Sequence, residues 1–445
     1  MTNTPNQQPG KPQPSRRDFI RASSLLMAGG LGIGQSAHAR GTDLIRVGLI
    51  GCGSRGSAAA IQLLNTTSGP VHLVALADVF PDRLQSAYRQ IRSQHADKLD
   101  LPPARRFVGL DAYQRLLQTD VDLVILATPP GFRPQQFRAA VAAGKHVFLE
   151  KPVAVDVPGV RCVLSASAEA QRQNLAVAVG LQRRHELAYR ETIAQLQSGR
   201  IGELIALRVY WNGSGVETRP RRANQSELEY QLRNWYYFTW LSGDHIVEQH
   251  VQNLDVANWL LQEAPTEVNA QGGREVRKRR GDDGRDYGQI FDHFFCEYTY
   301  PSGAHVFSQS RHIRNCWNRV SEHVDGTRGS ADITGGKIYD RAGAMVWRTK
   351  ATRAGHQQEQ HDLLADLRGG RIPNEGQYGA QSTLTAILGR LAAYSGQRIR
   401  WDEALASNIS LANPDVLTSL ADPAPTLPDQ HGDYEIAIPG ITATL

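Results

Sequence analysis

The sequence predicts an α/β protein with two domains, in which a parallel sheet covered by helices is followed by an α/β domain with a mainly antiparallel, open sheet. Short apolar runs alternate with helical patterns from residue 42 to about residue 180. Beyond that point the runs become longer, partly alternate, and are separated by turn signals such as Pro301-Ser302-Gly303. The chain has 445 residues, of which 41% are hydrophobic, so it is long enough for two domains of ordinary size.

The elements of the first sheet follow from local patterns. Strands are expected at 44–50, 71–78, 121–127, 145–149 and 175–180, and helices at 55–64, from Pro81 onward, and at 132–143. The run 121–127 is apolar except for Asp122, which is typical of a strand buried on both faces of a parallel sheet. Pro81 suits the first turn of a helix, and Gly144 suits the end of one.

The second sheet and the helices after it are predicted in the same way. Strands are expected at 205–211, 292–300, 304–311 and 320–324, helices at 357–367 and 378–394, and an extended segment at 422–439. We therefore divide the chain into a leader at 1–39, a first domain at 40–181, a second domain at 182–421 and an extended C-terminal segment at 422–445.

The leader has the layout of an export signal. The stretch Ser15-Arg16-Arg17-Asp18-Phe19-Ile20-Arg21 precedes an apolar stretch at 22–34 and the small residues Ala37-His38-Ala39. This pattern matches a twin-arginine signal with a cleavage site, and the alternative is a disordered basic tail. We expect the twin-arginine machinery to export the folded protein to the periplasm or otherwise out of the cytoplasm, with any cofactor already bound.

Composition argues against several other classes of partner. Most of the formal net charge of +5 comes from the leader, so we expect no nucleic-acid partner, and we expect the basic run 274–280 to be a solvated loop. No apolar run is long enough for a spanning helix, which argues against stable membrane insertion. The four cysteines lack paired spacing, and the spacing of Asp292-His293, His305 and His312 is not diagnostic, so we expect no metal site.

A glycine-rich loop predicts dinucleotide binding. Gly51-Cys52-Gly53-Ser54-Arg55-Gly56 lies between an expected strand and an expected helix. In this setting the first glycine permits a tight turn, the second lets the backbone approach a pyrophosphate, and the third allows close helix packing. Asp78 follows about 20 residues later, where a carboxylate accepts hydrogen bonds from ribose hydroxyls and favours NAD over NADP. Arg55 and Arg83 are arginines that could receive a phosphate and weaken that preference.

Together with three later elements, this loop resembles a known family. The elements are Ala127-Thr128-Pro129-Pro130, Ala143-Gly144-Lys145-His146-Val147 and Glu150-Lys151-Pro152. The combination is similar to the Gfo/Idh/MocA oxidoreductases, which implies a Rossmann domain, an open sheet that forms a homodimer or homotetramer, and a sugar or polyol substrate. Together, the glycine motif and the resemblance give these candidate residues for binding a cofactor that export would require to stay tightly bound: Gly51, Gly53, Ser54, Arg55, Gly56, Asp78, Thr128, Pro129, Glu150 and Lys151.

The same resemblance assigns catalytic roles. It implies that Lys151 contacts both the reacting hydroxyl and the nicotinamide ribose, where an ammonium stabilises developing negative charge. A second family element aligns with residues 242–255, in which Glu248 replaces the first Asp and Gln252 replaces the catalytic His. Gln252 cannot accept a proton. His250 lies roughly 200° away around an ideal helix, so it can substitute only if the helix has not yet begun there. His245 and His250 either belong to an altered active site or have a purely structural role.

The candidate substrate residues are Arg183, Tyr236 and Asn253. Tyr236 belongs to an aromatic segment, 233–240, whose rings could stack on a sugar or simply belong to the core. Asn253 directly follows Gln252 in the element that aligns with the family's catalytic motif.

Three functions remain open at this point. The first is an NAD(P)-dependent oxidoreductase that acts on a sugar, polyol or glycoside hydroxyl outside the cytoplasm, where turnover needs a closed redox cycle. The second is a redox-neutral, NAD-dependent glycoside hydrolase that works by transient oxidation at C3 and elimination. The third is an inactive sugar-binding protein, which the substitution Gln252 favours. The net products distinguish them, because fold alone does not decide function.

Overall fold

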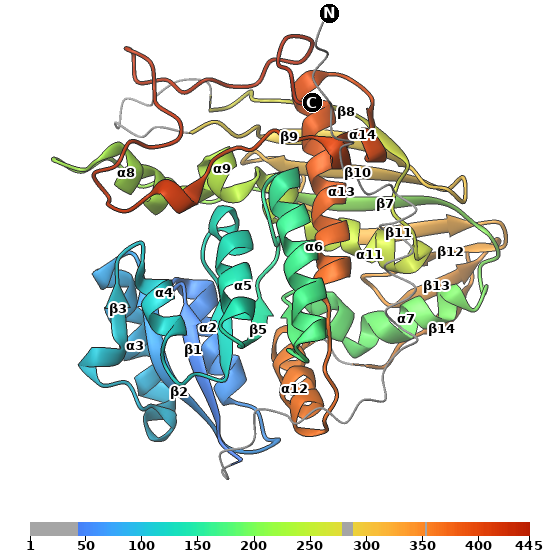
Figure 1. The fold of residues 1–445 in the computed structure, drawn as a ribbon. Helices are drawn as coiled ribbons and strands as arrows, with labels where there is room; N and C mark the ends of the chain where they lie inside the picture. The colour runs from blue at the N-terminus through green and yellow to red at the C-terminus, as the bar shows by residue number, and fades with distance from the viewer. Residues whose placement is uncertain (1–42, 278–287, 352–353) are drawn as a thin grey trace, which may run out of the picture.

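The computed structural model describes residues 43–277, 288–351 and 354–445. The predicted leader, 1–39, therefore lies outside the described residues, and so do Lys278, Arg279 and Arg280 of the basic run. The described chain contains two sheets, one near the N-terminal end, coloured blue to teal, and a larger one built from strands between residues 204 and 400 (Figure 1). This confirms the predicted α/β fold class with one parallel and one mainly antiparallel sheet.

The first sheet has six parallel strands in the order β3-β2-β1-β4-β5-β6. This is the strand order of a Rossmann fold, which reverses direction between β1 and β4. The strands are β1 (Ile45–Ile50), β2 (Val71–Asp78), β3 (Arg106–Val108), β4 (Leu123–Leu126), β5 (His146–Leu149) and β6 (Val177–Val179).

Helices cover both faces of this sheet. The helices are α2 (Ser54–Leu64), α3 (Pro81–His95), α4 (Ala112–Leu117), α5 (Arg133–Ala142) and α6 (Val157–Arg172). Side chains of α2 and α3 share one apolar cluster, and side chains of α4, α5 and α6 share the other. The carboxyl ends of β1, β2 and β4 therefore form an edge that the helices leave accessible, and this edge carries the glycine loop.

The second sheet has nine strands in the order β14-β13-β12-β11-β7-β10-β9-β8-β15. Among the described strands of this second sheet, only β7 and β10 pair in parallel, and the other neighbours are antiparallel. The strands are β7 (Leu204–Gly213), β8 (Glu267–Gly273), β9 (His293–Thr299), β10 (His305–His312), β11 (Arg319–Gly326), β12 (Gly329–Asp332), β13 (Lys337–Asp340), β14 (Met345–Arg348) and β15 (Ile399–Arg400).

Helices cover one face of the second sheet and leave strand residues exposed on the other. The covering helices include α7 (Leu187–Gln197), α11 (Val251–Leu261) and α13 (Gly376–Ser395). Along β9 the residues Phe294, Cys296 and Tyr298 are buried, whereas Phe295 between them is 41% exposed. This alternation is typical of a sheet with one solvent-facing side.

Helix α13 connects the two sheets, because it packs against α6 of the first domain and against β8, α10 (His245–Glu248) and α11 of the second. Most of its residues are buried, since it has neighbours on nearly every side. Figure 1 shows α13 and α6 side by side between the two sheets. The predicted helix at 378–394 is this element.

The last part of the chain returns to both domains. Helix α12 (Gly355–Arg368) places Leu363, Leu364 and Leu367 in the apolar cluster that α2 also supplies. After α14 (Trp401–Ala406), the only helix or strand is the short 3-10 helix η6 (Pro414–Val416). We call residues 407–445 the C-terminal arm, which includes the segment predicted at 422–445.

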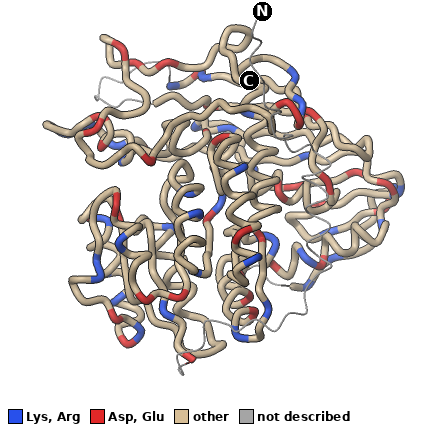
Figure 2. The backbone as a smooth tube through the Cα atoms, viewed as in Figure 1, with Lys and Arg blue, Asp and Glu red and all other residues tan. Residues whose placement is uncertain are grey.

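Charges of both signs are interspersed along the described chain (Figure 2). Within the described residues, no helix is long and apolar enough to cross a bilayer.

Candidate functional site

The glycine loop between β1 and α2 has the geometry that its glycines predict. Gly51 has φ +96°, and a Cβ there would lie 2.6 Å from the carbonyl carbon of Ala127. A Cβ on Gly56 would lie 1.9 Å from the Gly51 carbonyl oxygen, so any side chain would separate α2 from the loop. Around Gly53, by contrast, a Cβ would meet nothing within 4 Å. Two glycines are thus required by the protein itself, and the third borders open space.

That open space lies at the N-terminus of α2. Gly53 is the N-cap residue and supplies no side chain to the first backbone N–H groups of the helix. Unbonded N–H groups and the helix dipole together favour an anion at this position. The loop therefore fits the pyrophosphate of a dinucleotide.

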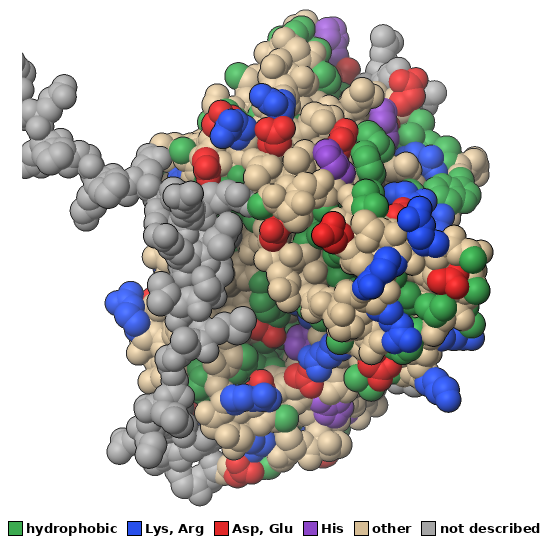
Figure 3. Space-filling view, turned by 90° about the vertical axis from the view of Figure 1, so that its right-hand side faces the viewer, with side chains coloured by type: hydrophobic (Ala, Val, Ile, Leu, Met, Phe, Trp, Pro, Cys, Tyr) green, Lys and Arg blue, Asp and Glu red, His purple; other side chains and the backbone are tan. Residues whose placement is uncertain are grey.

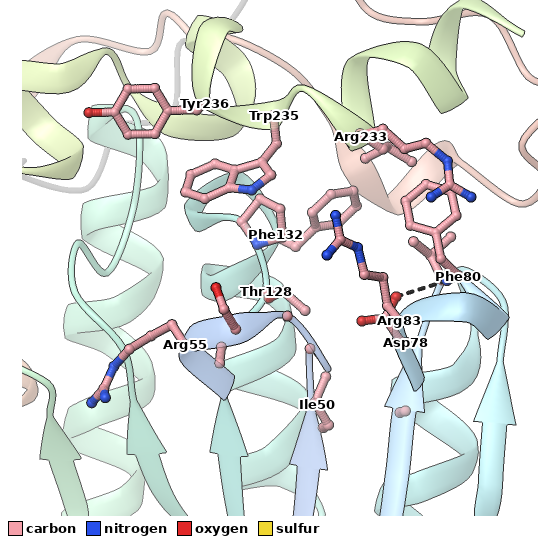
Figure 4. Close-up of a pocket in the computed structure, with 18 of the residues that line it drawn as sticks. Ile50, Arg55, Asp78, Phe80, Arg83, Thr128, Phe132, Arg233, Trp235 and Tyr236 are labelled. Atoms are coloured by element: carbon pink, nitrogen blue, oxygen red, sulfur yellow. Dashed lines mark hydrogen bonds between the residues drawn. The ribbon is translucent and has the colours of Figure 1, made fainter. Parts of the chain in front are cut away.

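A cavity of about 410 Å³ extends from this loop, with walls from both domains (Figure 4). Its volume falls in the range of roughly 300–1,000 Å³ that is usual for ligand pockets. First-domain residues in the wall include Gly51, Gly53, Ser54, Arg55, Asp78, Phe80, Arg83, Thr128, Pro129 and Phe132. Second-domain residues include Val216, Arg219, Leu232, Arg233, Trp235, Tyr236 and Tyr237.

Asp78 stands at one end of the cavity, at the end of β2. Its Oδ2 accepts a hydrogen bond of 2.7 Å from the Cys52 backbone N–H, and its Oδ1 accepts one of 2.8 Å from Phe80. Burial raises the pKa of the Asp78 carboxyl. The carboxylate thus fixes the glycine loop against the β2 end while it still borders the cavity. Arg83 lies beside it (Figure 4).

Thr128 and Pro129 follow β4 and form part of the cavity floor. The Thr128 hydroxyl lies 2.6 Å from the Gln136 amide oxygen, to which it donates. Both residues stand across the glycine loop from Asp78, at the point where the strand order reverses. Ligands bind at this point in open α/β sheets.

Arg55 borders the cavity, but its guanidinium is held by two carboxylates and points away from the labelled residues (Figure 4). Its Nε donates to Glu150, and its Nη2 donates to Glu359 of α12 at 2.9 Å. Burial opposes ionisation of Glu150, but the cations of Arg55, Arg133 and Lys151 outweigh burial and lower its pKa. Burial raises the pKa of Glu359. Glu359 was not found from the sequence because it lies more than 300 residues from Arg55.

Lys151 meets Glu248 across the domain boundary. The Lys151 Nζ donates to Glu248 Oε1 at 3.2 Å and to the Glu248 carbonyl at 2.5 Å. The side chains are only 11% and 9% exposed. The second carboxylate oxygen, Glu248 Oε2, is buried without a hydrogen-bond partner among the described residues. A buried acceptor that has no partner is free to bind a proton or a ligand hydroxyl.

His250 and Gln252 lie in the same segment as Glu248, and the His250 ring is bonded toward β10 rather than toward Lys151. Helix α10 ends at Glu248 and α11 begins at Val251, so the helix is interrupted at His250, which was the condition for its side chain to turn. However, His250 Nε2 lies 2.7 Å from the Ser308 hydroxyl on β10, and burial lowers its pKa to about 3. Gln252 is buried in the first turn of α11.

Arg183 and Asn253, predicted as substrate residues, meet at a carboxylate that sequence reasoning missed. Arg183 Nη1 donates to Glu322 Oε1 at 2.5 Å, and Asn253 Nδ2 donates to the same oxygen at 2.6 Å. Tyr189 donates to the other oxygen at 2.9 Å. Glu322 on β11 is fully buried. No local pattern marks Glu322, because Arg183 and Asn253 lie 139 and 69 residues away along the chain.

The aromatic segment 233–240 divides between the cavity and the core. Trp235, Tyr236 and Tyr237 border the cavity, whereas Phe238 and Trp240 are buried in an apolar cluster. The Tyr236 ring stacks on His312 with centroids 5.6 Å apart, and His312 stacks on His245 at 4.1 Å.

The prediction of a solvated loop at 274–280 was wrong for its described arginines. Arg277 is 9% exposed, lies over the Tyr237 ring at 4.7 Å and donates to the Phe291 carbonyl at 2.8 Å. Arg274 donates to the Gly288 carbonyl. An arginine can be buried when an aromatic face and carbonyls receive its charge, and a charge run alone does not reveal these partners. In the described chain, no group of three or more His, Cys, Asp or Glu side chains could hold a metal.

Comparison with known proteins agrees with this geometry. A model described as an oxidoreductase family with an NAD-binding Rossmann fold matches residues 45–180, and the GFO/IDH/MocA C-terminal domain matches residues 189–332. Inositol 2-dehydrogenase of Acidothermus cellulolyticus is 29% identical over 234 residues, or 53% of this chain and 58% of that protein. Glycosyl hydrolase family 109 protein 1 of Bacteroides fragilis is 26% identical over 249 residues, or 55% and 51%. The chain thus matches little more than half the length of these relatives.

Solved structures share the fold. A levoglucosan dehydrogenase in complex with NADH and levoglucosan matches with a TM-score of 0.64 and 18% identity, over 80% of this chain and 99% of that one. An aldose-aldose oxidoreductase from Caulobacter crescentus in complex with glycerol matches with a TM-score of 0.62 and 20% identity, over 80% and 99%. Because an N-terminal and a C-terminal model of one family match in order along the chain, the protein belongs to the Gfo/Idh/MocA family, and its first domain is an NAD-binding Rossmann domain.

Proposed function

We propose that the protein binds NAD(H) in the interdomain cavity and oxidises a hydroxyl-bearing carbon of a sugar, polyol or glycoside to a carbonyl, or reduces that carbonyl in the reverse direction. The observation that carries this proposal is the buried pair of Lys151 with Glu248, with Glu248 Oε2 left without a partner. Lys151 directly follows Glu150, whose carboxylate holds Arg55 in the cavity wall. Neither Lys151 nor Glu248 belongs to the cavity lining itself. Glu248 nevertheless lies near that lining, because its charge adds to the effect of burial that raises the pKa of Tyr236 in the cavity wall.

The cavity residues match the parts of a dinucleotide. The N-terminus of α2 suits the pyrophosphate, and Asp78, on the β2 side of the loop, suits the adenosine ribose hydroxyls. Thr128 and Pro129, on the β4 side of the loop, border the space into which the nicotinamide half would extend. A carboxylate at Asp78 favours NAD over NADP, because it repels a 2′-phosphate. When bound, the nicotinamide ring exchanges a hydride with the substrate carbon.

The protein's own groups handle the proton. Lys151 holds its ammonium beside the substrate oxygen and stabilises negative charge that develops there. Glu248 takes the hydroxyl proton on Oε2, since its Oε1 is bound to Lys151 and the Gln252 amide does not titrate. His250 plays no part in this step, because its Nε2 faces Ser308.

Export is part of the proposal. The paired arginines Arg16 and Arg17 and the Ala37-His38-Ala39 site support delivery of the folded protein, by the twin-arginine machinery, to the periplasm or another compartment outside the cytoplasm. No free nucleotide pool exists there, so the cofactor has to remain tightly bound and be recycled in place. One substrate then reduces what another has oxidised.

A second candidate is the redox-neutral hydrolysis of a glycoside. The similarity to Glycosyl hydrolase family 109 protein 1 favours this candidate. It also suits a compartment without free nucleotide, because a hydrolase that re-reduces its own intermediate needs no second substrate. The same Lys151 and Glu248 serve the oxidation step in both candidates. An inactive sugar-binding protein is the third outcome that the experiment below can return.

We further propose a homodimer or homotetramer formed through the open face of the second sheet. Phe295, Trp317 and Val320 are between 41% and 56% exposed. Figure 3 shows hydrophobic and basic side chains gathered toward the right of that view of the protein. Large apolar side chains on an uncovered sheet face are typical of an interface. Sedimentation of the wild-type protein and of Phe295→Asp tests this, since a monomer in both contradicts it.

The experiment that tests the function uses protein exported from its native type of host. The protein is denatured, the released nicotinamide nucleotide is quantified, and glycosides are scanned for cleavage without added cofactor. Stoichiometric NAD(H) with cleavage establishes the hydrolase, and stoichiometric NAD(H) without cleavage supports coupled oxidoreduction. Protein without nucleotide that stays inert contradicts both and leaves the binding role.

A further inference from the structure

The second domain covers the cavity with a short helical segment, 227–242, which we call the roof. It consists of α8 (Glu227–Arg233), η5 (Trp235–Tyr237) and α9 (Thr239–Ser242). Arg233, Trp235 and Tyr236 lie opposite Asp78 and Thr128 across the cavity (Figure 4). One side of the roof therefore faces the space proposed for the dinucleotide.

The other side of the roof contacts the C-terminal arm. Gln231 Nε2 donates to the Thr426 carbonyl at 2.7 Å. The Tyr434 hydroxyl donates to Glu227 and accepts from Arg221 Nη2 at 2.8 Å. The Tyr434 ring packs edge-on against Phe238 with centroids 5.0 Å apart. The arm thus holds both polar and apolar groups of the roof.

The first residues of the arm are attached to helix α6 of the first domain. Arg161 Nη1 donates to the carbonyls of Leu405 and Ser407 at 2.8 and 2.6 Å. Asp156, the N-cap of the same helix, accepts from the Leu411 backbone N–H at 2.9 Å. These contacts fix the arm before it reaches the roof.

The arm ends at helix α13. The Gly440 backbone N–H donates to the Ser395 carbonyl at 2.8 Å, and the Thr444 hydroxyl donates to the Leu391 carbonyl at 3.3 Å. The arm therefore crosses the roof between two attachments on helices of the body. Movement of the roof away from the cavity would have to break contacts at the crossing or at one attachment.

One apolar cluster joins the arm, the roof and the cavity wall. It contains Tyr434 and Ala424 of the arm, Leu232 of the roof, and Phe80 and Phe132 of the first domain. Both phenylalanines and Leu232 also border the cavity. Opening the roof would expose this cluster to water, at a free-energy cost proportional to the apolar area uncovered.

We propose that the C-terminal arm is a strap that retains the dinucleotide: it holds the roof closed, so that release of the cofactor requires the arm to detach. The inference rests on the proposed function, because it concerns retention of the same NAD(H). It supplies a physical reason why a cofactor loaded before export would stay bound in a compartment that cannot replace it.

The test measures how fast NADH leaves the full-length protein. The protein is loaded with NADH and mixed with excess NAD, and the loss of bound-NADH fluorescence gives the release rate. Tyr434→Ala removes two hydrogen bonds and one ring contact, so we expect release to accelerate about tenfold. Tyr434→Phe, which keeps the ring, should fall between this variant and the wild type. Deletion of residues 408–445 should give the fastest release.

Two control variants separate retention from general loss of stability. Leu427→Ala changes an arm residue that is 62% exposed, and Ile338→Ala removes a fully buried side chain at the far end of the second sheet. Both should release NADH at the wild-type rate. Unchanged release in Tyr434→Ala, when limited proteolysis shows a loosened arm, would overturn the proposal. Equal acceleration in Ile338→Ala would also overturn it. Wild-type protein that binds no NADH would instead contradict the proposed function.

Discussion

Two regions of the site, the glycine loop and the segment 245–253 that carries Glu248, owe their geometry to different causes. At the loop, the backbone itself forbids side chains, since a Cβ on Gly51 or Gly56 would overlap neighbouring backbone atoms. At the segment 245–253, side chains from remote strands and helices decide where each group points. The first region therefore has a fixed sequence pattern, whereas the second can lose a histidine and still keep a buried carboxylate beside a lysine.

The sharpest test of this difference is to remove the proposed catalytic pair. Lys151→Ala and Glu248→Gln should each lower turnover by about 10² to 10⁴-fold, because proton transfer and charge stabilisation at the substrate oxygen are lost. Nucleotide content after denaturation should stay that of the wild type, since the glycine loop is unchanged. Retained turnover in Glu248→Gln would exclude Glu248 as the proton acceptor.

The second-largest expected effect is on the free energy of unfolding, when the buried ion pair at Glu322 is broken. Arg183→Met leaves Glu322 buried without its cation, which should cost about 3–5 kcal/mol of unfolding free energy. The double variant with Glu322→Gln should recover much of that loss, because no unpaired charge remains. Chemical denaturation measures both. A single variant as stable as the wild type would contradict a stabilising Arg183–Glu322 ion pair.

Within the loop, two glycines offer a matched pair. Gly56→Ala should destabilise the fold by about 1–3 kcal/mol and weaken NADH binding, because its Cβ overlaps the Gly51 carbonyl. Gly53→Ala should fold normally and weaken only binding, since its Cβ points into the space proposed for the pyrophosphate. Thermal unfolding without nucleotide, followed by NADH titration, separates the two effects. Equal destabilisation by both would contradict the assigned roles.

A histidine near the joint between the domains gives a smaller, pH-dependent effect. The contact of Nδ1 with Asp362 at 2.7 Å and the Glu375 carboxylate 3.5 Å from Nε2 outweigh burial and raise the pKa of His185 to about 9, while its partner Asp362 has a lowered pKa. Folding is therefore favoured by protonated His185 below its unfolded pKa of about 6.5, and this gain is lost as pH rises through 9. We expect stability to fall by about 1–2 kcal/mol between pH 7 and pH 9.5. His185→Gln should remove most of that slope in urea titrations.

The smallest expected effect on turnover is at Gln252, which stands where the family element has its catalytic histidine. If Glu248 accepts the proton, Gln252→His should change turnover by less than about tenfold. A much larger gain would show that the second region has lost its base rather than replaced it. The comparison is made with wild-type protein of equal nucleotide content.

Sequence patterns predicted the parallel strands well because continuous apolar runs leave few alternatives. Strand β3 was missed, since its three residues are at most half-buried and carry little apolar signal. Strands β12 to β14 were missed for a similar reason, because they are short and lie at the sheet edge.

The residues of the candidate site also differ in whether a local sequence pattern marks them. The glycine loop and Asp78 could be predicted as site residues because they form a spaced motif at strand ends, and Lys151 because it stands in an element shared with the family. Glu322 and Glu359 could not be, because each is defined by an arginine that lies far away in sequence, Arg183 and Arg55 respectively. Long-range ion pairs leave no local pattern, so only the folded chain reveals them.

The position of helix α13 has a consequence for how the molecule behaves as a whole. One continuous cluster includes β4 and α6 of the first domain, α13, and β9 to β11 of the second. Domains that share a core in this way melt together, so calorimetry should record a single cooperative transition. The Rossmann half is therefore not an independent module that could be excised or recombined with another substrate domain. A fragment ending near residue 181 would expose the face of α6 that α13 covers, and would be prone to aggregate.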